Sequence, residues 1–176
     1  MTPKSRSDVP EYADINNTVN TLVGQVNGRY GAPAWTPIRY VNRAYSRASL
    51  AALYRMARVG LVTPLRDGMN LVAKEYVAAQ DPENPGVLVL SQFAGAAEEL
   101  DGAILINPHE PEAMAAAIDA ALQMPLDERQ RRYRRMYRHL AVHDIDRWAE
   151  SFLAALMESR HPPRIFNNLR QLFAVR

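Results

Sequence analysis

Three short apolar runs, each followed by a helical pattern, constrain the fold of this chain more than any other feature. The runs are VGLVTPL (Val59–Leu65), GVLVLS (Gly86–Ser91) and AILIN (Ala103–Asn107). Uninterrupted apolar runs of this length are typical of strands buried on both faces of a sheet. Their alternation with helices is typical of a parallel sheet with right-handed crossovers. The sequence therefore predicts an α/β fold, with a Rossmann-like parallel sheet flanked by helices.

The helices are predicted from apolar residues that recur every three or four positions. Before the first run, one such pattern extends from Tyr12 to the glycines of NGRYG, and another covers SRASLAALYRMAR with Ser46 or Ser49 as its cap. A short β-rich run, Thr36–Asn42, lies between them. The later patterns are Met69–Ala79, a short AGAAEEL, PEAMAAAIDAALQM, Leu126–Val142 and Ile145–Met157. We expect residues 1–158 to form one domain and residues 159–176 a loosely ordered tail.

Composition narrows the class of protein. The 176 residues, 48% of them apolar, suffice for a single compact unit. A formal net charge of only +2 gives no reason to expect a nucleic-acid partner. The absence of cysteine excludes disulfides and thiolate metal sites and fits a cytoplasmic location. No apolar run approaches the ~20 residues of a membrane span, and the first residues lack the apolar core of a secretory signal, so no membrane partner is predicted.

Two other features have simpler interpretations than a site. The run RQRRYRRMYR contains six arginines between Arg129 and Arg138. At helical spacing its apolar residues form one stripe, which consists of Tyr133, Met136, Tyr137 and Leu140. The charged residues lie on another face, which we interpret as solvated; they are Arg131, Arg134, Arg135 and Arg138. Four histidines lack partners at ligand spacing, so no metal site is predicted; they are His109, His139, His143 and His161.

The stretch LVTPLRDGMNLVAKEYVAAQ (Leu61–Gln80) carries the main functional signal. We expect a strand to end near Thr63 and a helix to begin near Met69, which is where open α/β sheets bind ligands. Free N–H groups from Gly68 to Leu71 would suit a diphosphate, and Gly68 would let the backbone approach it closely. Asp67 would accept from sugar hydroxyls, and Glu75, one turn beyond Leu71, from the two hydroxyls of a ribose. The alternative makes Asp67 the helix N-cap and Glu75 a solvated residue.

Two stretches of the chain resemble one family of enzymes. GLVTPLRDGMNLVAKEYVAAQ and GVLVLSQFAGAAEEL are similar to the trehalose-6-phosphate synthases of glycosyltransferase family 20. These enzymes transfer glucose from UDP-glucose to glucose 6-phosphate with retention, and they have two Rossmann-like domains in the GT-B architecture. The resemblance extends to about Leu156 and implies most of the C-terminal, donor-binding domain. It implies no cofactor and no metal.

The resemblance also implies roles for individual residues. Asp67 matches the acid that binds the donor glucose, which makes it the catalytic candidate, and Glu75 matches the ribose ligand. Tyr45 falls where the family has an aromatic residue beside the uracil, and Arg6 matches an arginine that binds the phosphate of glucose 6-phosphate. The remaining donor-binding positions are Gly68, Met69 and Asn70 around the sugar, Leu71 and Val72 at the phosphates, and the adjoining Ala73 and Lys74.

Departures from the family pattern bear on activity. The family's other phosphate ligands, an arginine and a lysine in a DRLDY-K-G stretch, and its acceptor domain lie upstream of the first residue here. We therefore expect a truncated reading frame, a remnant or a piece of a longer protein that is inactive alone. Two alternatives stay open: a non-catalytic remnant that binds UDP-sugar weakly or is an interaction surface, and a glucosylglycerol-phosphate synthase-like activity. A homo-oligomer is possible for the full-length family.

Overall fold

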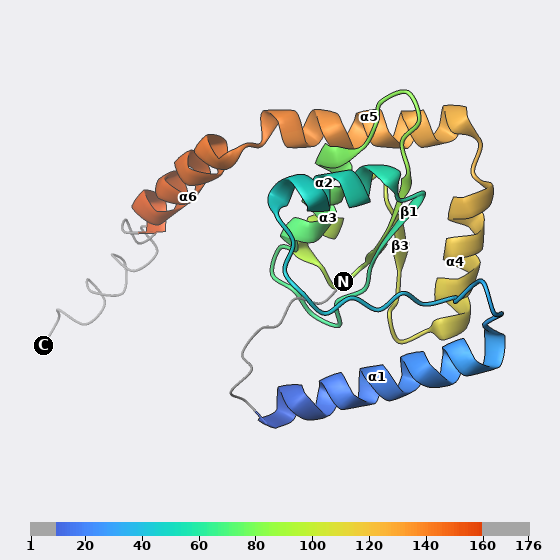
Figure 1. Cartoon of the computed structure of the whole chain (residues 1–176). Coiled ribbons are helices and arrows are strands. Elements are labelled where there is room, and N and C mark those ends of the chain that lie inside the picture. Colours follow the sequence, from blue (N-terminus) through green and yellow to red (C-terminus); the bar gives the residue numbers. More distant parts are fainter. Residues whose placement is uncertain (1–9, 160–176) are drawn as a thin grey trace, which may run out of the picture. The chain divides into compact units, whose positions relative to one another are not determined.

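The computed structural model describes residues 10–159 of the chain. It separates into two compact units, one that ends at Leu50 and one that begins at Ala51 (Figure 1). The length and composition predict one compact unit, so this division was not expected. The domain bounds 1–158 and 159–176 stay predictions.

The first unit contains helix α1 (Pro10–Tyr30), the segment that follows it and the first residues of α2 (Arg47–Met56). The helix runs past Gly28 and ends before Gly31, where a Cβ atom would lie 2.4 Å from the Asn27 carbonyl oxygen. The amide of Asn27 pairs with the backbone N–H and carbonyl of Ile38, both at 2.9 Å. The β-rich run Thr36–Asn42 forms no strand. The Asn27 amide therefore takes the backbone groups of Ile38 that a neighbouring strand would otherwise use.

A three-stranded parallel sheet lies at the centre of the second unit. Its strands are β1 (Val59–Val62), β2 (Val87–Ser91) and β3 (Ile104–Ile106), paired in the order β1-β2-β3. This confirms the predicted parallel sheet. Every residue of β2 is buried, whereas β1 and β3 are only partly covered. Burial on both faces therefore applies to the central strand alone.

The helices follow the predicted order along the chain. Ser46 caps α2, because its hydroxyl oxygen accepts from the Ser49 N–H at 3.2 Å. Helix α3 begins at Leu71, two residues later than predicted. The elements after α1 are α2 (Arg47–Met56), α3 (Leu71–Ala79), the 3-10 turn η1 (Gly95–Ala97), α4 (Pro111–Gln123), α5 (Leu126–Val142) and α6 (Ile145–Ser159).

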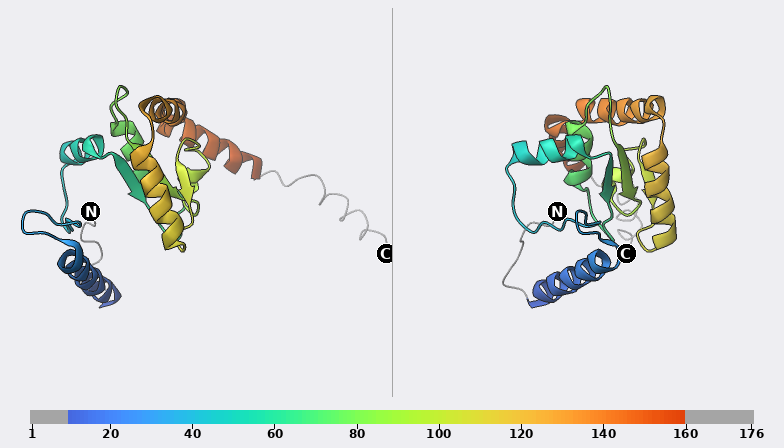
Figure 2. Two further views of the ribbon diagram at one scale, coloured as in Figure 1. Left: turned by 90° about the vertical axis from the view of Figure 1, so that its right-hand side faces the viewer. Right: turned by 45° about the vertical axis from the view of Figure 1, so that its right-hand side comes forward.

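The alternation of β2 side chains builds a separate core on each face of the sheet. Leu88 and Leu90 pack with α3, η1 and α5 on one face. Val87 and Val89 pack with α4 on the other. The right-hand view of the ribbon shows α3 and α4 on opposite sides of the sheet (Figure 2). The fold is therefore a three-layer α/β arrangement.

Tyr76 anchors α3 to the sheet. Its hydroxyl donates to the Ala57 carbonyl at 3.0 Å and lies 3.4 Å from the Val87 carbonyl. Two glycines make room for it: a Cβ at Gly60 would lie 2.8 Å from the ring, and one at Gly86 would lie 2.1 Å from the hydroxyl. This packing fixes the helix that follows the predicted site.

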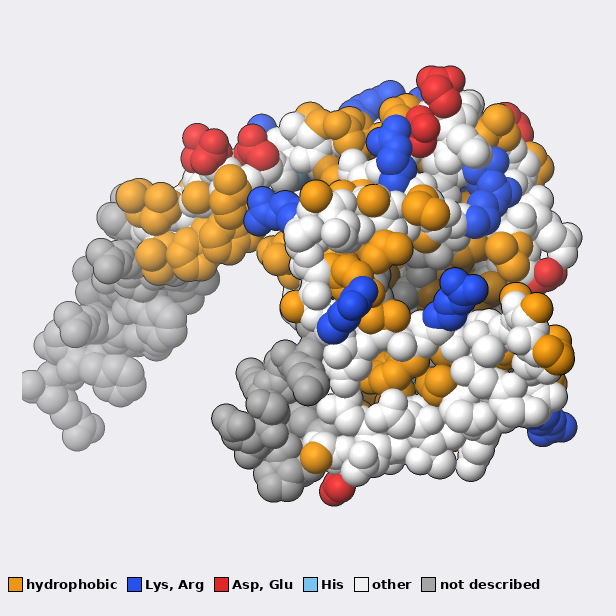
Figure 3. All heavy atoms as spheres, in the orientation of Figure 1, with side chains coloured by type: hydrophobic (Ala, Val, Ile, Leu, Met, Phe, Trp, Pro, Cys, Tyr) orange, Lys and Arg blue, Asp and Glu red, His pale blue; other side chains and the backbone are white. Residues whose placement is uncertain are grey.

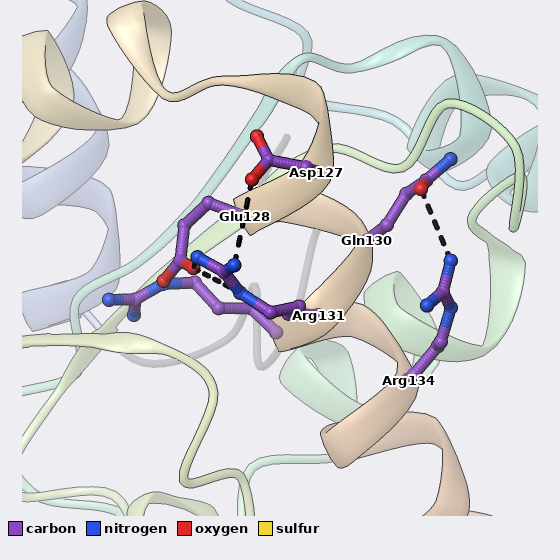
Figure 4. A network of polar contacts seen from close by, with 6 residues as sticks. Asp127, Glu128, Gln130, Arg131 and Arg134 are labelled. Carbon is purple, nitrogen blue, oxygen red and sulfur yellow. Dashed lines mark hydrogen bonds and ion pairs between the residues drawn. The ribbon is translucent and has the colours of Figure 1, made fainter.

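The arginine-rich face of helix α5 is exposed to solvent, as predicted. Arg131 pairs with Asp127 and Glu128, and Arg134 pairs with the side chain of Gln130 (Figure 4). Arg129 differs, because it is buried and donates to the Asn84 side chain at 2.8 Å and to the Pro85 carbonyl.

Hydrophobic side chains gather on the surface over α6 (Figure 3). Trp148 and Phe152 stack with ring centroids 5.5 Å apart, and both are exposed. Over residues 10–159, none of the helices combines the length and apolar character that crossing a membrane requires.

Candidate functional site

The loop between β1 and α3 is fastened to the segment that follows β2. The Asp67 N–H donates to the Phe93 carbonyl at 3.1 Å, and the Asp67 carbonyl accepts from the Gly95 N–H at 3.0 Å. The Ala96 N–H donates to the Met69 carbonyl at 2.7 Å. Three backbone hydrogen bonds thus hold the loop at the carboxyl ends of two parallel strands, the position at which α/β sheets bind ligands.

Gly95 allows this close approach. A Cβ atom there would lie 2.2 Å from the Gly68 carbonyl oxygen and 3.4 Å from the Met69 Cα. Neither Gly68 nor Gly95 has a positive φ, so space rather than backbone conformation requires glycine at position 95. On the opposite side, a Cβ atom at Gly68 would meet no atom within 4 Å. The loop therefore has one packed side, toward Gly95, and one open side, at Gly68.

The carboxylate of half-buried Asp67 is held at both oxygens. Oδ1 accepts from the Met69 N–H at 3.2 Å, and Oδ2 accepts from the Asn70 side-chain amide at 2.9 Å. Each carboxylate oxygen has two acceptor positions, so each keeps one position for another donor. An oriented pair of acceptors of this kind suits two neighbouring hydroxyl groups of a sugar.

Asn70, not Asp67, is the N-cap of α3. Its Oδ1 accepts from the Ala73 N–H at 2.9 Å. Its backbone is left-handed, with φ 75° and ψ 86°, and it is the one non-glycine residue with positive φ in residues 10–159. The helix therefore begins two residues after the predicted start near Met69. Asp67 accepts from the Met69 N–H, and the left-handed Asn70 that follows is the cap of the first turn.

The late helix start changes which amides face outward. The Met69 and Ala73 N–H groups are taken by Asp67 and Asn70. Those of Leu71 and Val72, in the first turn, have no intrahelical acceptor, and none of the described residues accepts from them. Of the amides expected to be free at Gly68–Leu71, only that of Met69 is therefore taken by a described residue. The Leu71 and Val72 amides lie at the helix start, where an anion would also meet the positive end of the helix dipole.

Glu75 lies on the exposed face of α3, together with Leu71 and Val72. The opposite face, with Ala73, Tyr76 and Val77, is buried in the core. Burial, and then the nearby Glu75 carboxylate, raise the pKa of Tyr54 in α2. Glu75 therefore lies on the same exposed face as the free amides, one helical turn away from them.

Two of the predicted donor-binding residues have structural partners. The Ala73 side chain is fully buried. The Lys74 ammonium lies 2.6 Å from Glu99 Oε2, which is also 3.4 Å from His139 Nε2. Although partial burial alone would raise it, Lys74 and then His139 lower the pKa of the Glu99 carboxyl. Through Glu99, Lys74 thus links α3 to the segment that follows η1 and to α5.

The structure does not test the two remaining predicted ligands. Tyr45 belongs to the first unit, is half-buried, and has the Arg43 guanidinium 4.8 Å from its ring centroid. Arg6 lies outside the described residues. Their roles at the base and at an acceptor phosphate stay predictions. In residues 10–159, no group of three acidic or histidine side chains is arranged to hold a metal ion.

Sequence reasoning missed the contributions of Gly95 and of the Asn70 side chain. AGAAEEL was interpreted as an ordinary helix start, although a glycine in a short turn next to a strand end is a signal of close backbone approach. Asn70 is three residues after Asp67 and three before Ala73, and asparagine favours both capping and the left-handed conformation. That spacing was the available signal.

Comparisons with known proteins point to one family. The model of glycosyltransferase family 20 matches residues 1–158. A trehalose-6-phosphate synthase from Sinorhizobium fredii is 58% identical over 159 residues, which are 90% of this chain and 34% of the relative. The one from Cronobacter sakazakii is 52% identical over 170 residues, 96% of this chain and 36% of the relative.

Solved structures agree as well. The α,α-trehalose-phosphate synthase (UDP-forming) of Burkholderia xenovorans in complex with glucose-6-phosphate superposes with a TM-score of 0.85 at 54% identity, over 88% of this chain and 34% of that one. An E. coli structure bound with UDP-2-fluoro glucose has a TM-score of 0.85 at 53% identity, over 88% of this chain and 34% of that one. This chain thus spans about a third of the length of the relatives it matches.

Proposed function

Because the chain belongs to glycosyltransferase family 20, we propose that it supplies the UDP-glucose-binding part of a trehalose-6-phosphate synthase. The reaction transfers glucose from UDP-glucose to glucose 6-phosphate with retention and gives trehalose 6-phosphate and UDP. It needs no cofactor and takes place in the cytoplasm. The proposal is supported by solved relatives that hold glucose-6-phosphate or UDP-2-fluoro glucose.

One observation supports the proposal above the others. The loop from Asp67 to Asn70 presents an oriented carboxylate next to two helix-start amides without partners among the described residues. The carboxylate accepts from the donor glucose, and the Leu71 and Val72 N–H groups donate to the diphosphate. Glu75, one turn further along α3, accepts from the ribose hydroxyls. The order sugar, diphosphate and ribose along the chain then matches the order of groups in UDP-glucose.

The chemistry assigned to these residues is positioning and charge stabilisation. The bond between the anomeric carbon and the diphosphate oxygen breaks, and a bond to the acceptor hydroxyl oxygen forms on the same face of the sugar. The acceptor proton passes to the departing phosphate, so no protein nucleophile is required. Asp67 holds the glucose in place, and the Leu71 and Val72 amides stabilise the negative charge that develops on the leaving diphosphate.

Titration calorimetry with UDP and UDP-glucose tests this division of roles. Glu75→Ala should weaken the binding of both ligands by roughly 1.5–3 kcal/mol, because a charged hydrogen-bond acceptor is lost. Asp67→Ala should weaken UDP-glucose binding and leave UDP nearly unchanged. Glu98→Ala, which removes an exposed carboxylate from the end of η1, is the matched control. Equal losses for both ligands in the Asp67 variant would contradict the assignment.

A further inference from the structure

We propose that Asn70 is the positioning residue for Asp67, and that it sets the preference of the site for a nucleotide sugar over the free nucleotide. This deepens the proposed function and rests on it. Asn70 joins the two parts of the site, since one side-chain atom caps α3 and the other holds the carboxylate.

The orientation of the Asn70 amide follows from its two partners. Oδ1 faces the Ala73 N–H, a donor, at 2.9 Å. Nδ2 faces Asp67 Oδ2, an acceptor, at 2.9 Å. Exchanging the two ends would set an amine against an N–H and an oxygen against a carboxylate. Only one orientation satisfies both contacts, so the cap fixes the donor that the carboxylate meets.

The contact determines the plane of the Asp67 carboxylate. The Met69 N–H alone, bound to Oδ1 at 3.2 Å, would leave the group free to turn about its terminal bond. The second bond, to Oδ2, removes that freedom. The open acceptor positions then point in fixed directions, so a sugar binds without a further ordering cost.

The backbone at Asn70 supports a functional reading. A left-handed non-glycine residue costs free energy, and such residues collect where the surrounding structure needs them. An ordinary helix cap has an extended backbone, whereas this one has φ 75°. The unusual conformation is what lets a single side chain reach both Ala73 and Asp67.

The charges around Asp67 allow a test by pH. The backbone and carboxylate of Asp67 form hydrogen bonds with Phe93, Gly95, Met69 and Asn70, none of which titrates. Arg66 precedes it and is exposed. The first turn of α3 has no acidic residue, and Lys74 in that helix pairs with Glu99. A carboxylate introduced at position 70 would therefore face Asp67, which has no ion-pair partner within residues 10–159, and the two carboxylates would favour sharing one proton.

Three variants test the proposal without ligand and with it. Asn70→Gly keeps the left-handed backbone and removes both side-chain bonds. Asn70→Asp keeps the cap but opposes two carboxylates. The exchanged double variant Asp67→Asn/Asn70→Asp restores an amide–carboxylate pair with its polarity reversed. Asn107 is the matched control, because its amide also meets a carboxylate, Glu110 at 2.8 Å, at the turn before α4.

Without ligand, urea unfolding measures the contact itself. Asn70→Asp should be less stable than the wild type at pH 8 and recover as the pH falls toward 5, when one proton is shared. The exchanged variant should recover stability at pH 8. No recovery in either case would show that the Asn70–Asp67 contact is not formed in solution and would overturn the proposal.

With ligand, calorimetry compares UDP with UDP-glucose. Asn70→Gly should lower the affinity ratio of UDP-glucose to UDP by roughly tenfold, the effect expected when a charged group loses its hydrogen-bond partner. In Asn70→Asp, UDP-glucose affinity relative to the wild type at the same pH should rise on acidification. Asn107→Gly and Asn107→Asp should change neither the affinity ratio of UDP-glucose to UDP nor the pH dependence of UDP-glucose affinity.

The ligand results separate the inference from the proposed function. Equal losses for UDP and UDP-glucose in Asn70→Gly would mean that Asn70 acts only as a helix cap, and this would overturn the positioning role. A wild-type chain that binds neither ligand would contradict the proposed function, and the assignment of Asn70 to sugar preference would fall with it. The unfolding measurements would still decide whether the contact exists.

Discussion

The hydroxyl of Tyr76 gives a prediction whose size depends on pH. Tyr76→Phe removes the bond to the Ala57 carbonyl, at 3.0 Å, and leaves that partly buried acceptor without its donor. The expected loss is about 1–2 kcal/mol near pH 8. Burial raises the pKa of Tyr76 to about 12, from an ordinary value of 10.0. The folded protein therefore keeps the hydroxyl protonated at a pH where the unfolded chain ionises it.

The raised pKa makes the stability that Tyr76 contributes disappear on the alkaline side. That contribution is fully present below the unfolded pKa of 10.0 and is lost as the pH rises toward the folded value of about 12. At pH 11 linkage gives a loss of about 1.4 kcal/mol for the wild type and none for the phenylalanine variant. The two proteins should therefore have nearly equal stability close to pH 11.

Urea unfolding followed by circular dichroism at pH 8 and pH 11 measures this difference. Because the other tyrosines are the same in both proteins, their ionisation contributes equally to both stabilities and cancels in the difference. Tyr137→Phe is the control, because Tyr137 is exposed and its removal should change little at either pH. A stability gap of the same size at both pH values would refute the reasoning, since it would show that the Tyr76 hydroxyl is not protected from ionisation.

Three further predictions concern the loop, the ion pair and the reaction. Gly95→Ala should destabilise the chain by roughly 1–3 kcal/mol, because its Cβ would clash with the Gly68 carbonyl. Gly68→Ala should change stability by less than about 0.5 kcal/mol but weaken UDP-glucose binding in calorimetry. A larger loss of stability for Gly68→Ala than for Gly95→Ala would contradict the assignment of a packed side at Gly95 and an open side at Gly68. Because Lys74 and His139 lower the pKa of Glu99, the stability that this carboxylate contributes is present above the ordinary pKa of 4.5 and is lost as the pH falls through the folded value. In urea titrations, Glu99→Gln should therefore be less stable than the wild type at pH 7 and equally stable under strongly acidic conditions. Because the proposal assigns donor binding to these residues, the 176-residue chain incubated with UDP-glucose and glucose 6-phosphate should release no detectable UDP; turnover near that of an intact relative would show that it also binds the acceptor.

The sheet was predictable because its signal is local: each strand lies within a short, uninterrupted apolar run. The apolar run GVLVLS has no polar residue before Ser91, and every residue of β2 is indeed buried. Helices α4 and α5 were predicted to within one residue, since each has an apolar stripe and a proline at or before its start. Thr36–Asn42 has strand propensity but no strand, because strand formation depends on a partner that the sequence does not specify.

The geometry of the loop was harder to predict. Asp67 and Asn70 are both capping residue types, and the sequence does not say which one begins the helix. The outcome depends on the contact with Gly95 and Ala96, about thirty residues away, which is a tertiary effect. Arg129 illustrates the opposite case, because it lies one turn before Tyr133 on the buried stripe of α5, and helical spacing could have separated it from the solvated arginines.

The most direct test of the account is to locate where UDP-glucose binds in the chain. Backbone amide spectra recorded during a UDP-glucose titration report each residue separately. The account predicts shifts at Asp67–Val72 and at Glu75, with little change along α1 or the arginine-rich face of α5. With UDP alone, Leu71, Val72 and Glu75 should shift while Asp67 responds less. Shifts confined to α5 or α6, or none at saturating UDP-glucose, would contradict the assignment of this loop as the donor site.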